Sequence, residues 1–107
     1  MKHLFIVNPA AGKGQGIDKL ILKINAVSRE QGVDTEVYVT TRVGDAEEYT
    51  RTYCSKYDRN SSIRVYACGG DGTLNEVLNG MAGFPSVEAA CVPIGSGNDF
   101  IRNMGAA

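Results

Sequence analysis

Five consecutive residues combine the properties that suit phosphate binding: Gly69, Gly70, Asp71, Gly72 and Thr73. Glycine permits a positive φ and lets the backbone approach a ligand without a clash from a Cβ atom, so several N–H groups can point at one anion. Thr73 is expected to open the following helix. There its hydroxyl can cap free N–H groups or bond a phosphate oxygen, and the helix dipole favours anions. The segment therefore predicts a phosphate-binding turn between a strand and a helix.

Asp71 needs an explanation of its own, because a carboxylate beside phosphates repels them unless a cation or a proton transfer is involved. Mg²⁺ takes oxygen ligands, and a carboxylate within reach of a reacting hydroxyl can act as a general base. We therefore expect Asp71 to organise magnesium-bound phosphates or to act as a catalytic base. The alternative is a plain turn with Asp71 as the N-cap, although a cap does not require three glycines in four positions.

Small and polar residues also follow three other apolar runs. They are Asn8, Pro9, Ala10, Ala11 and Gly12 after residues 4–7, Thr40 and Thr41 after residues 37–39, and Ser96 with its flanking glycines after the run that begins at Ala89. The first of these loops matches neither the P-loop nor the dinucleotide-binding fingerprint. Taken alone, this loop could be a flexible connection as readily as a binding loop. Thr40 and Thr41 could likewise be ordinary strand residues, since threonine is common in strands.

The elements that must position these loops follow from the hydrophobic pattern. Apolar runs predict strands at 4–7, 37–39, 63–68 and 89–94, and helical spacing predicts helices from Ile17 to a cap at Gly32, from an N-cap at Asp45 to Tyr57, and from Thr73 to about Gly83. Nearly continuous apolar strands that alternate with helices are typical of a parallel sheet covered on both faces. The fold class is therefore α/β, a three-layer α/β/α Rossmann-like open parallel sheet.

In such a sheet the carboxyl ends of the strands lie at one edge, and ligands bind there. All four unusual loops follow strand ends, so we expect them to meet and form a cleft for a large anionic ligand.

Composition limits the remaining possibilities. With 107 residues, of which 43% are hydrophobic and 21% charged, the chain is expected to fold as one globular domain. The net charge of -1 and the scattered basic residues argue against nucleic acid. No apolar run is long enough to span a bilayer and no leader opens the chain, so we expect a cytoplasmic protein. The three cysteines are expected to be small apolar core residues, and His3 to have no chemical role.

Three segments together resemble the catalytic-domain signature of diacylglycerol kinases and related lipid kinases. They are Asn8-Pro9 with its glycine loop, residues 69–76, and residues 93–100, and the resemblance covers essentially the whole chain. The resemblance implies a fold shared with NAD kinases. It also implies ATP-dependent, Mg²⁺-assisted phosphorylation of a lipid hydroxyl such as that of diacylglycerol.

The resemblance further implies which residues contact ATP. They are Asn8, Pro9, Ala10, Ala11, Gly12, Thr40, Gly69, Gly70, Asp71, Gly72, Thr73, Leu74, Asn75 and Ser96. Many relatives have threonine where this chain has Ser96, and the hydroxyl is retained. Glu76, Asn98 and Asp99 are expected near the cleft.

Members of this family continue into a β-rich domain that carries the glutamate thought to act as general base. Residues 1–107 are accordingly expected to be the N-terminal nucleotide-binding domain, without that C-terminal domain and inactive alone. The lipid substrate implies work at a membrane surface by a peripheral protein. The acceptor lipid and the formation of a homodimer are left open.

Two alternatives remain. An NAD kinase would share the Gly-Gly-Asp-Gly-Thr turn and use Asp71 as its base. A receiver or flavodoxin-like binding module would share the strand order, but a receiver needs an acidic cluster after the first strand, where this chain has Asn8 and Pro9.

Overall fold

Strands and helices alternate along the chain in the computed structural model, which describes residues 1–10 and 16–92. The strands are β1 (Lys2–Val7), β2 (Asp34–Val39), β3 (Ile63–Cys68) and β4 (Glu88–Val92), and the helices are α1 (Ile17–Gln31), α2 (Asp45–Tyr57) and α3 (Asp71–Gly80). This order is the one that the hydrophobic pattern predicts.

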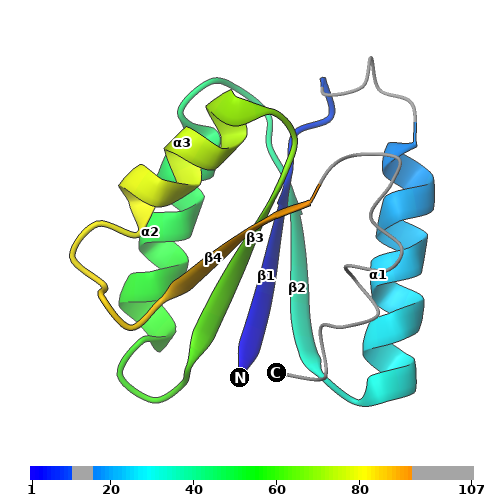
Figure 1. The fold of residues 1–107 in the computed structure, drawn as a ribbon, viewed down its shortest axis with the longest axis horizontal. Coiled ribbons are helices and arrows are strands. Elements are labelled where there is room, and N and C mark those ends of the chain that lie inside the picture. The colour runs from blue at the N-terminus through cyan, green and yellow to red at the C-terminus, as the bar shows by residue number, and fades with distance from the viewer. Residues whose placement is uncertain (11–15, 93–107) are drawn as a thin grey trace.

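The strands form one parallel sheet in the order β2-β1-β3-β4 (Figure 1). Val7 at the end of β1 pairs with Val39 of β2 and with Cys68 of β3, and Cys68 pairs in turn with Val92 of β4. Because the last residues of all four strands are in register, the loops that follow them begin at one edge of the sheet.

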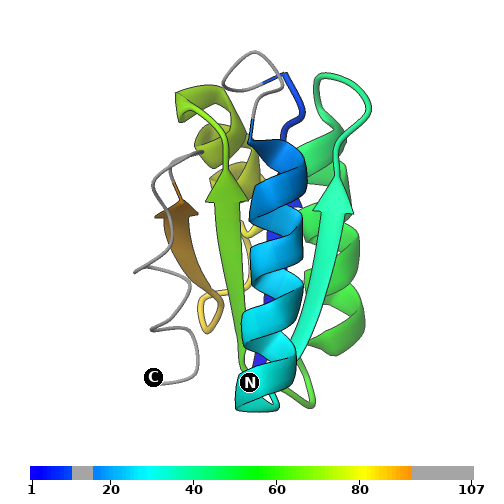
Figure 2. The same cartoon turned by 90° about the vertical axis from the view of Figure 1, so that its right-hand side faces the viewer.

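Successive side chains of the strands pack into two separate cores. Phe5 and Tyr66 lie on the face covered by α1, whereas Leu4 and Val65 lie on the face covered by α2 and α3. Figures 1 and 2 show α1 on one side of the sheet and the other two helices on the opposite side. Both faces of the central strands are therefore buried, which confirms the three-layer α/β/α architecture.

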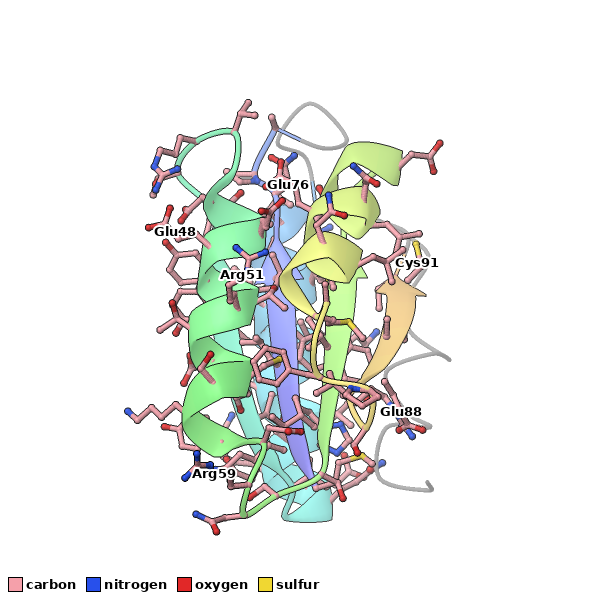
Figure 3. All side chains as sticks on the ribbon, turned by 90° about the vertical axis from the view of Figure 1, so that its left-hand side faces the viewer. Glu48, Arg51, Arg59, Glu76, Glu88 and Cys91 are labelled. Carbon is pink, nitrogen blue, oxygen red and sulfur yellow. The ribbon has the colours of Figure 1, made fainter. Side chains whose placement is uncertain are left out.

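Helices α2 and α3 pack closely because α3 carries a glycine at their contact. A Cβ atom at Gly80 would lie 2.6 Å from the carbonyl oxygen of Glu47 and 2.8 Å from Cβ of Thr50. Arg51, on the outer surface of α2 in Figure 3, donates from Nη2 to the carbonyl oxygen of Asn79 at 3.1 Å. The two helices are thus joined at van der Waals contact and by a hydrogen bond.

Several predicted boundaries change. β1 begins at Lys2 and β2 at Asp34, earlier than the apolar runs, because the ladder of parallel pairing extends to the exposed pair Lys2 and Asp34. The predicted C-cap Gly32 is confirmed with φ of 65°, whereas the predicted N-cap of α2 is wrong: Gly44 holds that position and Asp45 is the first helical residue. Pro93 and Ile94, the predicted end of β4, lie outside the described residues.

Some predictions for individual side chains are confirmed and one is wrong. Cys54 and Cys68 are buried as predicted, and burial raises the pKa of the Cys68 thiol to about 12, so it stays protonated. Cys91, on edge strand β4, is exposed, so its predicted place in the core is wrong (Figure 3). His3 is a core histidine, with Nδ1 2.8 Å from the Tyr66 hydroxyl. Within the described residues, no helix has the length and apolar character needed to cross a bilayer.

Candidate functional site

The turn after β3 depends on Gly69 for space. A Cβ atom there would lie 2.5 Å from Oγ1 of Thr73 and 3.3 Å from Cβ of Asn8, so only glycine fits between these side chains. The predicted positive φ is wrong for this turn, since Gly70 has φ of -95° and none of its glycines is in the left-handed region. Gly69 is required for close approach and not for backbone handedness.

The amino end of α3 opens onto free space. A Cβ atom at Gly70 or at Gly72 would meet nothing within 4 Å, and Asp71 between them is exposed. α3 begins at Asp71 and not at Thr73, and no side chain caps its first turn. The first N–H groups of a helix have no intrahelical partner, so this end offers hydrogen-bond donors and a favourable dipole to an anion.

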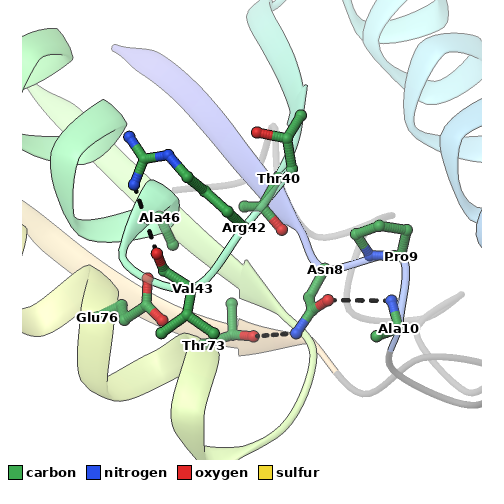
Figure 4. A pocket seen from close by; sticks show the side chains of 10 residues that line it. Asn8, Pro9, Ala10, Thr40, Arg42, Val43, Ala46, Thr73 and Glu76 are labelled. Carbon is green, nitrogen blue, oxygen red and sulfur yellow. Dashed lines mark hydrogen bonds between the residues drawn. The ribbon is translucent and has the colours of Figure 1, made fainter.

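Asn8 joins the ends of β1 and β3 to α3. Its backbone N–H donates to the carbonyl oxygen of Cys68 at 3.0 Å, and its side-chain Nδ2 donates to Oγ1 of Thr73 at 3.4 Å. Its Oδ1 accepts from the backbone N–H of Ala10 at 3.0 Å (Figure 4). These contacts fix the start of the first loop beside the first turn of α3.

The loop after β2 is held from both ends. The N–H of Thr40 donates to the carbonyl oxygen of Val7 at 2.9 Å, which keeps Thr40 buried beside β1. At the other end, Asp45 Oδ2 accepts from the backbone N–H of Thr41 at 2.7 Å. That N–H, which stabilises the charged form, holds the pKa of Asp45 below its ordinary value.

The loops after β1 and β2, together with α2 and the first turns of α3, line a cavity of about 310 Å³. Its walls are Asn8, Pro9, Ala10, Thr40, Thr41, Arg42, Val43, Ala46, Thr73 and Glu76 (Figure 4). A volume of this order lies at the lower end of the range for small-molecule sites. The cavity opens at the carboxyl edge of the sheet, where the sequence predicts the cleft.

Five of the predicted contact residues line this cavity: Asn8, Pro9, Ala10, Thr40 and Thr73. Gly69 and Gly70 form the adjacent turn, Asp71 and Gly72 begin α3, and Asn75 is exposed on that helix. Leu74 differs from the rest because its side chain packs against the core beneath α2 and α3. Ala11, Gly12 and Ser96 lie outside the described residues. For all the residues of this predicted set, contact with a nucleotide stays a prediction.

The structure adds Arg42, Val43 and Ala46 to the walls. Arg42 lies two residues after Thr40, which the sequence places at the cleft. Extending the predicted site along the same loop would therefore have included Arg42. Its guanidinium Nη2 pairs with Glu48 at 2.6 Å and its Nη1 donates to the Val43 carbonyl oxygen at 3.4 Å. The positive charge that the guanidinium brings to this side of the cavity is therefore offset by the Glu48 carboxylate.

Glu76 gives the cavity an uneven charge distribution. Its Oε1 is buried and has no hydrogen-bond partner, and a carboxylate repels phosphate. An anionic group would therefore lie toward the turn at Gly70 and Gly72, away from Glu76. Uncharged hydrogen-bond donors would suit the Glu76 side.

The fold places the chain among open parallel-sheet α/β/α domains, and its cavity lies at the carboxyl edge of the strands, where such domains commonly bind ligands. The sequence pattern of the diacylglycerol kinase catalytic domain matches residues 2–107, and the chain therefore belongs to that family.

Individual relatives agree with this family. A diacylglycerol kinase of Staphylococcus epidermidis is 40% identical over 102 residues, which are 92% of this chain and 30% of the relative. A diacylglycerol kinase of Staphylococcus saprophyticus is 37% identical over 103 residues, with 92% and 31% covered. A crystal structure of a diacylglycerol kinase from Bacillus anthracis superimposes with a TM-score of 0.65 at 36% identity, over 99% of this chain and 37% of that one. The chain spans about a third of the length of these relatives.

Proposed function

We propose that this chain is the nucleotide-binding part of an ATP-dependent lipid kinase, which transfers the γ-phosphate of ATP to the hydroxyl of a lipid such as diacylglycerol. The observation that carries the proposal is the meeting of two strand-end loops and the first turn of α3 around one cavity, where Asn8, Thr40 and Thr73 lie together. The names of the relatives support the reaction class.

ATP would be held by its phosphates at the turn after β3. The space in front of Gly70 and Gly72, the uncapped first turn of α3 and the hydroxyl of Thr73 supply room, N–H donors and a side-chain donor. Asn8 to Gly12 of the first loop would contact the nucleotide, and Ser96 would add a hydroxyl. Phosphoryl transfer depends mostly on such positioning and on charge stabilisation.

Mg²⁺ would accompany the ATP phosphates, and Asp71 is the residue of this turn suited to it. Its carboxylate is exposed at the amino end of α3, and carboxylate oxygens are ligands that Mg²⁺ accepts. When bound, Mg²⁺ would neutralise part of the phosphate charge, and Asp71 would hold it beside the phosphates. In the described residues, no three carboxylate, imidazole or thiol side chains gather as a metal cluster, so Asp71 would act together with the phosphates.

The lipid seat and the general base are not assigned to this chain, which we propose to be inactive alone. A lipid substrate places the complete protein at a membrane surface, and we propose a cytoplasmic, peripheral enzyme.

A chimera tests this proposal. Residues 2–107 replace the matching segment of the Staphylococcus epidermidis diacylglycerol kinase, and transfer of labelled phosphate from ATP to diacylglycerol is measured with the chimera and with the chain alone. We expect activity from the chimera only, and loss of turnover in its Asp71→Ala variant. Robust phosphorylation by the chain alone, or near-normal activity of the variant, would contradict the proposal.

A further inference from the structure

The loop after β2 forms one wall of the cavity but has little apolar packing to hold it. Arg42 is exposed and Val43 is 92% exposed, although both line the cavity. The N-cap of α2 is Gly44, so no side chain at that position ties the end of the loop to the helix. A loop with few buried contacts is expected to open easily, so its shape must come from specific hydrogen bonds.

Those hydrogen bonds converge on one buried carboxylate. Asp45 is 6% exposed, and its Oδ2 accepts from the Thr41 backbone N–H at 2.7 Å and from Thr41 Oγ1 at 3.1 Å. The Tyr38 hydroxyl donates to Oδ1 at 3.0 Å and to Oδ2 at 2.9 Å. The carboxylate thus joins the strand before the loop, the loop itself and the helix after it.

The Tyr38 hydroxyl is itself fixed. The Tyr38 ring stacks on Tyr49 of α2, with centroids 3.7 Å apart and planes 9° apart, and the Tyr49 hydroxyl donates to Glu36 of β2. A donor held by a stacked ring loses less side-chain entropy on bonding than a free one. The Tyr38 hydroxyl is therefore already in place to donate to Asp45.

Burying a carboxylate is unfavourable unless its hydrogen bonds compensate, and here the donors of Thr41 and Tyr38 do so, which ties the shape of the loop to this one side chain. We propose that Asp45 is a positioning residue of the nucleotide site: through Thr41 and Tyr38 it holds residues 40–44 in the shape that lines the cavity, without touching the ligand. This inference rests on the proposed ATP site. Asp45 lies next to Ala46, a wall residue, but is not itself part of the wall.

The test compares ATP affinity with loop order in the 107-residue chain. Dissociation constants for ATP with Mg²⁺ are measured by calorimetry for the wild type, Asp45→Ala and Asp45→Asn, under conditions in which each is fully folded by circular dichroism. Exchange of the Thr41 amide hydrogen is followed by NMR. Asp45→Ala should weaken ATP binding by roughly tenfold and expose the Thr41 amide, which corresponds to the loss of one charge-assisted hydrogen bond or more. Asparagine retains an acceptor for Thr41 and should restore most of the affinity.

Two further variants complete the design. Tyr38→Phe keeps the stacked ring and removes one donor, so it should weaken ATP binding by a few-fold and replaces Asp45→Ala if that variant fails to fold. Asp18→Asn removes an exposed acid from the first turn of α1 and should leave ATP affinity unchanged.

The outcomes separate this inference from the proposed function. Unchanged ATP affinity in folded Asp45→Ala or Tyr38→Phe, with wild-type binding intact, overturns the positioning role alone, even if stability falls. A wild-type chain that binds no ATP overturns the proposed function and the positioning role with it.

Discussion

The side-chain amide of Asn8, at the end of β1, donates from Nδ2 to Oγ1 of Thr73 in the first turn of α3, 65 residues away in the sequence. Gly69 lies directly against both side chains. The loop after β1, the turn after β3 and the first turn of α3 therefore meet at one point. This contact places the first loop beside the first turn of α3, and both line the same cavity.

Thr73→Val should weaken ATP binding, because valine keeps the shape of threonine and removes the hydroxyl that Asn8 contacts. Loss of one such hydrogen-bonding group is worth about 1 kcal/mol, or roughly fivefold in affinity. Calorimetric titration with ATP measures the change. Thr52→Val is the matched control, because the Thr52 hydroxyl is exposed on α2 and bonds only the Glu48 carbonyl oxygen among the contacts described for it. An equal loss of affinity in both variants would contradict a local role for Thr73.

Gly69→Ala and Gly70→Ala should behave differently. Alanine at 69 would displace Thr73 and Asn8, so both stability and ATP affinity should fall, the former by about 1–3 kcal/mol. Alanine at 70 meets nothing within 4 Å and its φ is accessible, so the free energy of unfolding should stay within about 0.5 kcal/mol while ATP binding is lost. Denaturant unfolding and ATP titration on both variants test this. Normal ATP binding by Gly70→Ala would mean that no ligand approaches that backbone.

Gly80→Ala should destabilise the chain by about 1–3 kcal/mol, because the added methyl group collides with the Glu47 carbonyl oxygen and with Thr50 on α2. Urea unfolding measures the loss. Asn79→Ala, an exposed neighbour on the same helix, serves as the control and should change stability little. A fully stable Gly80→Ala would contradict the close packing of α2 on α3.

Stability should fall as the pH drops below about 6.5, because burial lowers the pKa of His3 from its ordinary 6.5. The unfolded chain then binds the proton more readily than the folded chain, so this contribution is complete above pH 6.5 and is lost below it. Since His3 is the one histidine of the sequence, unfolding of His3→Gln should show a flatter dependence between pH 6.5 and the range where carboxylates titrate. Identical pH profiles for the two proteins would exclude this effect.

The sequence predicts the fold well because strand and helix periods are local properties of the chain. β3 keeps its predicted bounds, Ile63–Cys68, since a run that is apolar except for Arg64 is enough to define a central strand. β2 is less well predicted, because it is an edge strand and its pairing to β1 extends through the polar residues Asp34 and Thr35. The extent of pairing between two distant strands cannot be predicted from the sequence of either strand alone.

The site is predicted in part for a similar reason. The glycine turn is recognisable from residue types, but its backbone conformation is not, and Gly69 is required for spatial contact with Asn8 and Thr73 instead of for a positive φ. The hydrogen bonds of Asp45 could not be predicted, because an acid before a helix suggests an N-cap. Its actual partners, Thr41 and Tyr38, become neighbours only when the loop folds back.

The most direct test of the central claim is titration of the ¹⁵N-labelled chain with ATP and Mg²⁺, followed by NMR. We predict saturable shifts of the amides of Asn8, Thr40, Gly70 and Thr73, which come from three separate strand ends, and little change at Gly32 and Asn60 at the opposite edge of the sheet. Absence of binding at millimolar ATP, or shifts confined to that opposite edge, would contradict a nucleotide site at the carboxyl edge of this sheet.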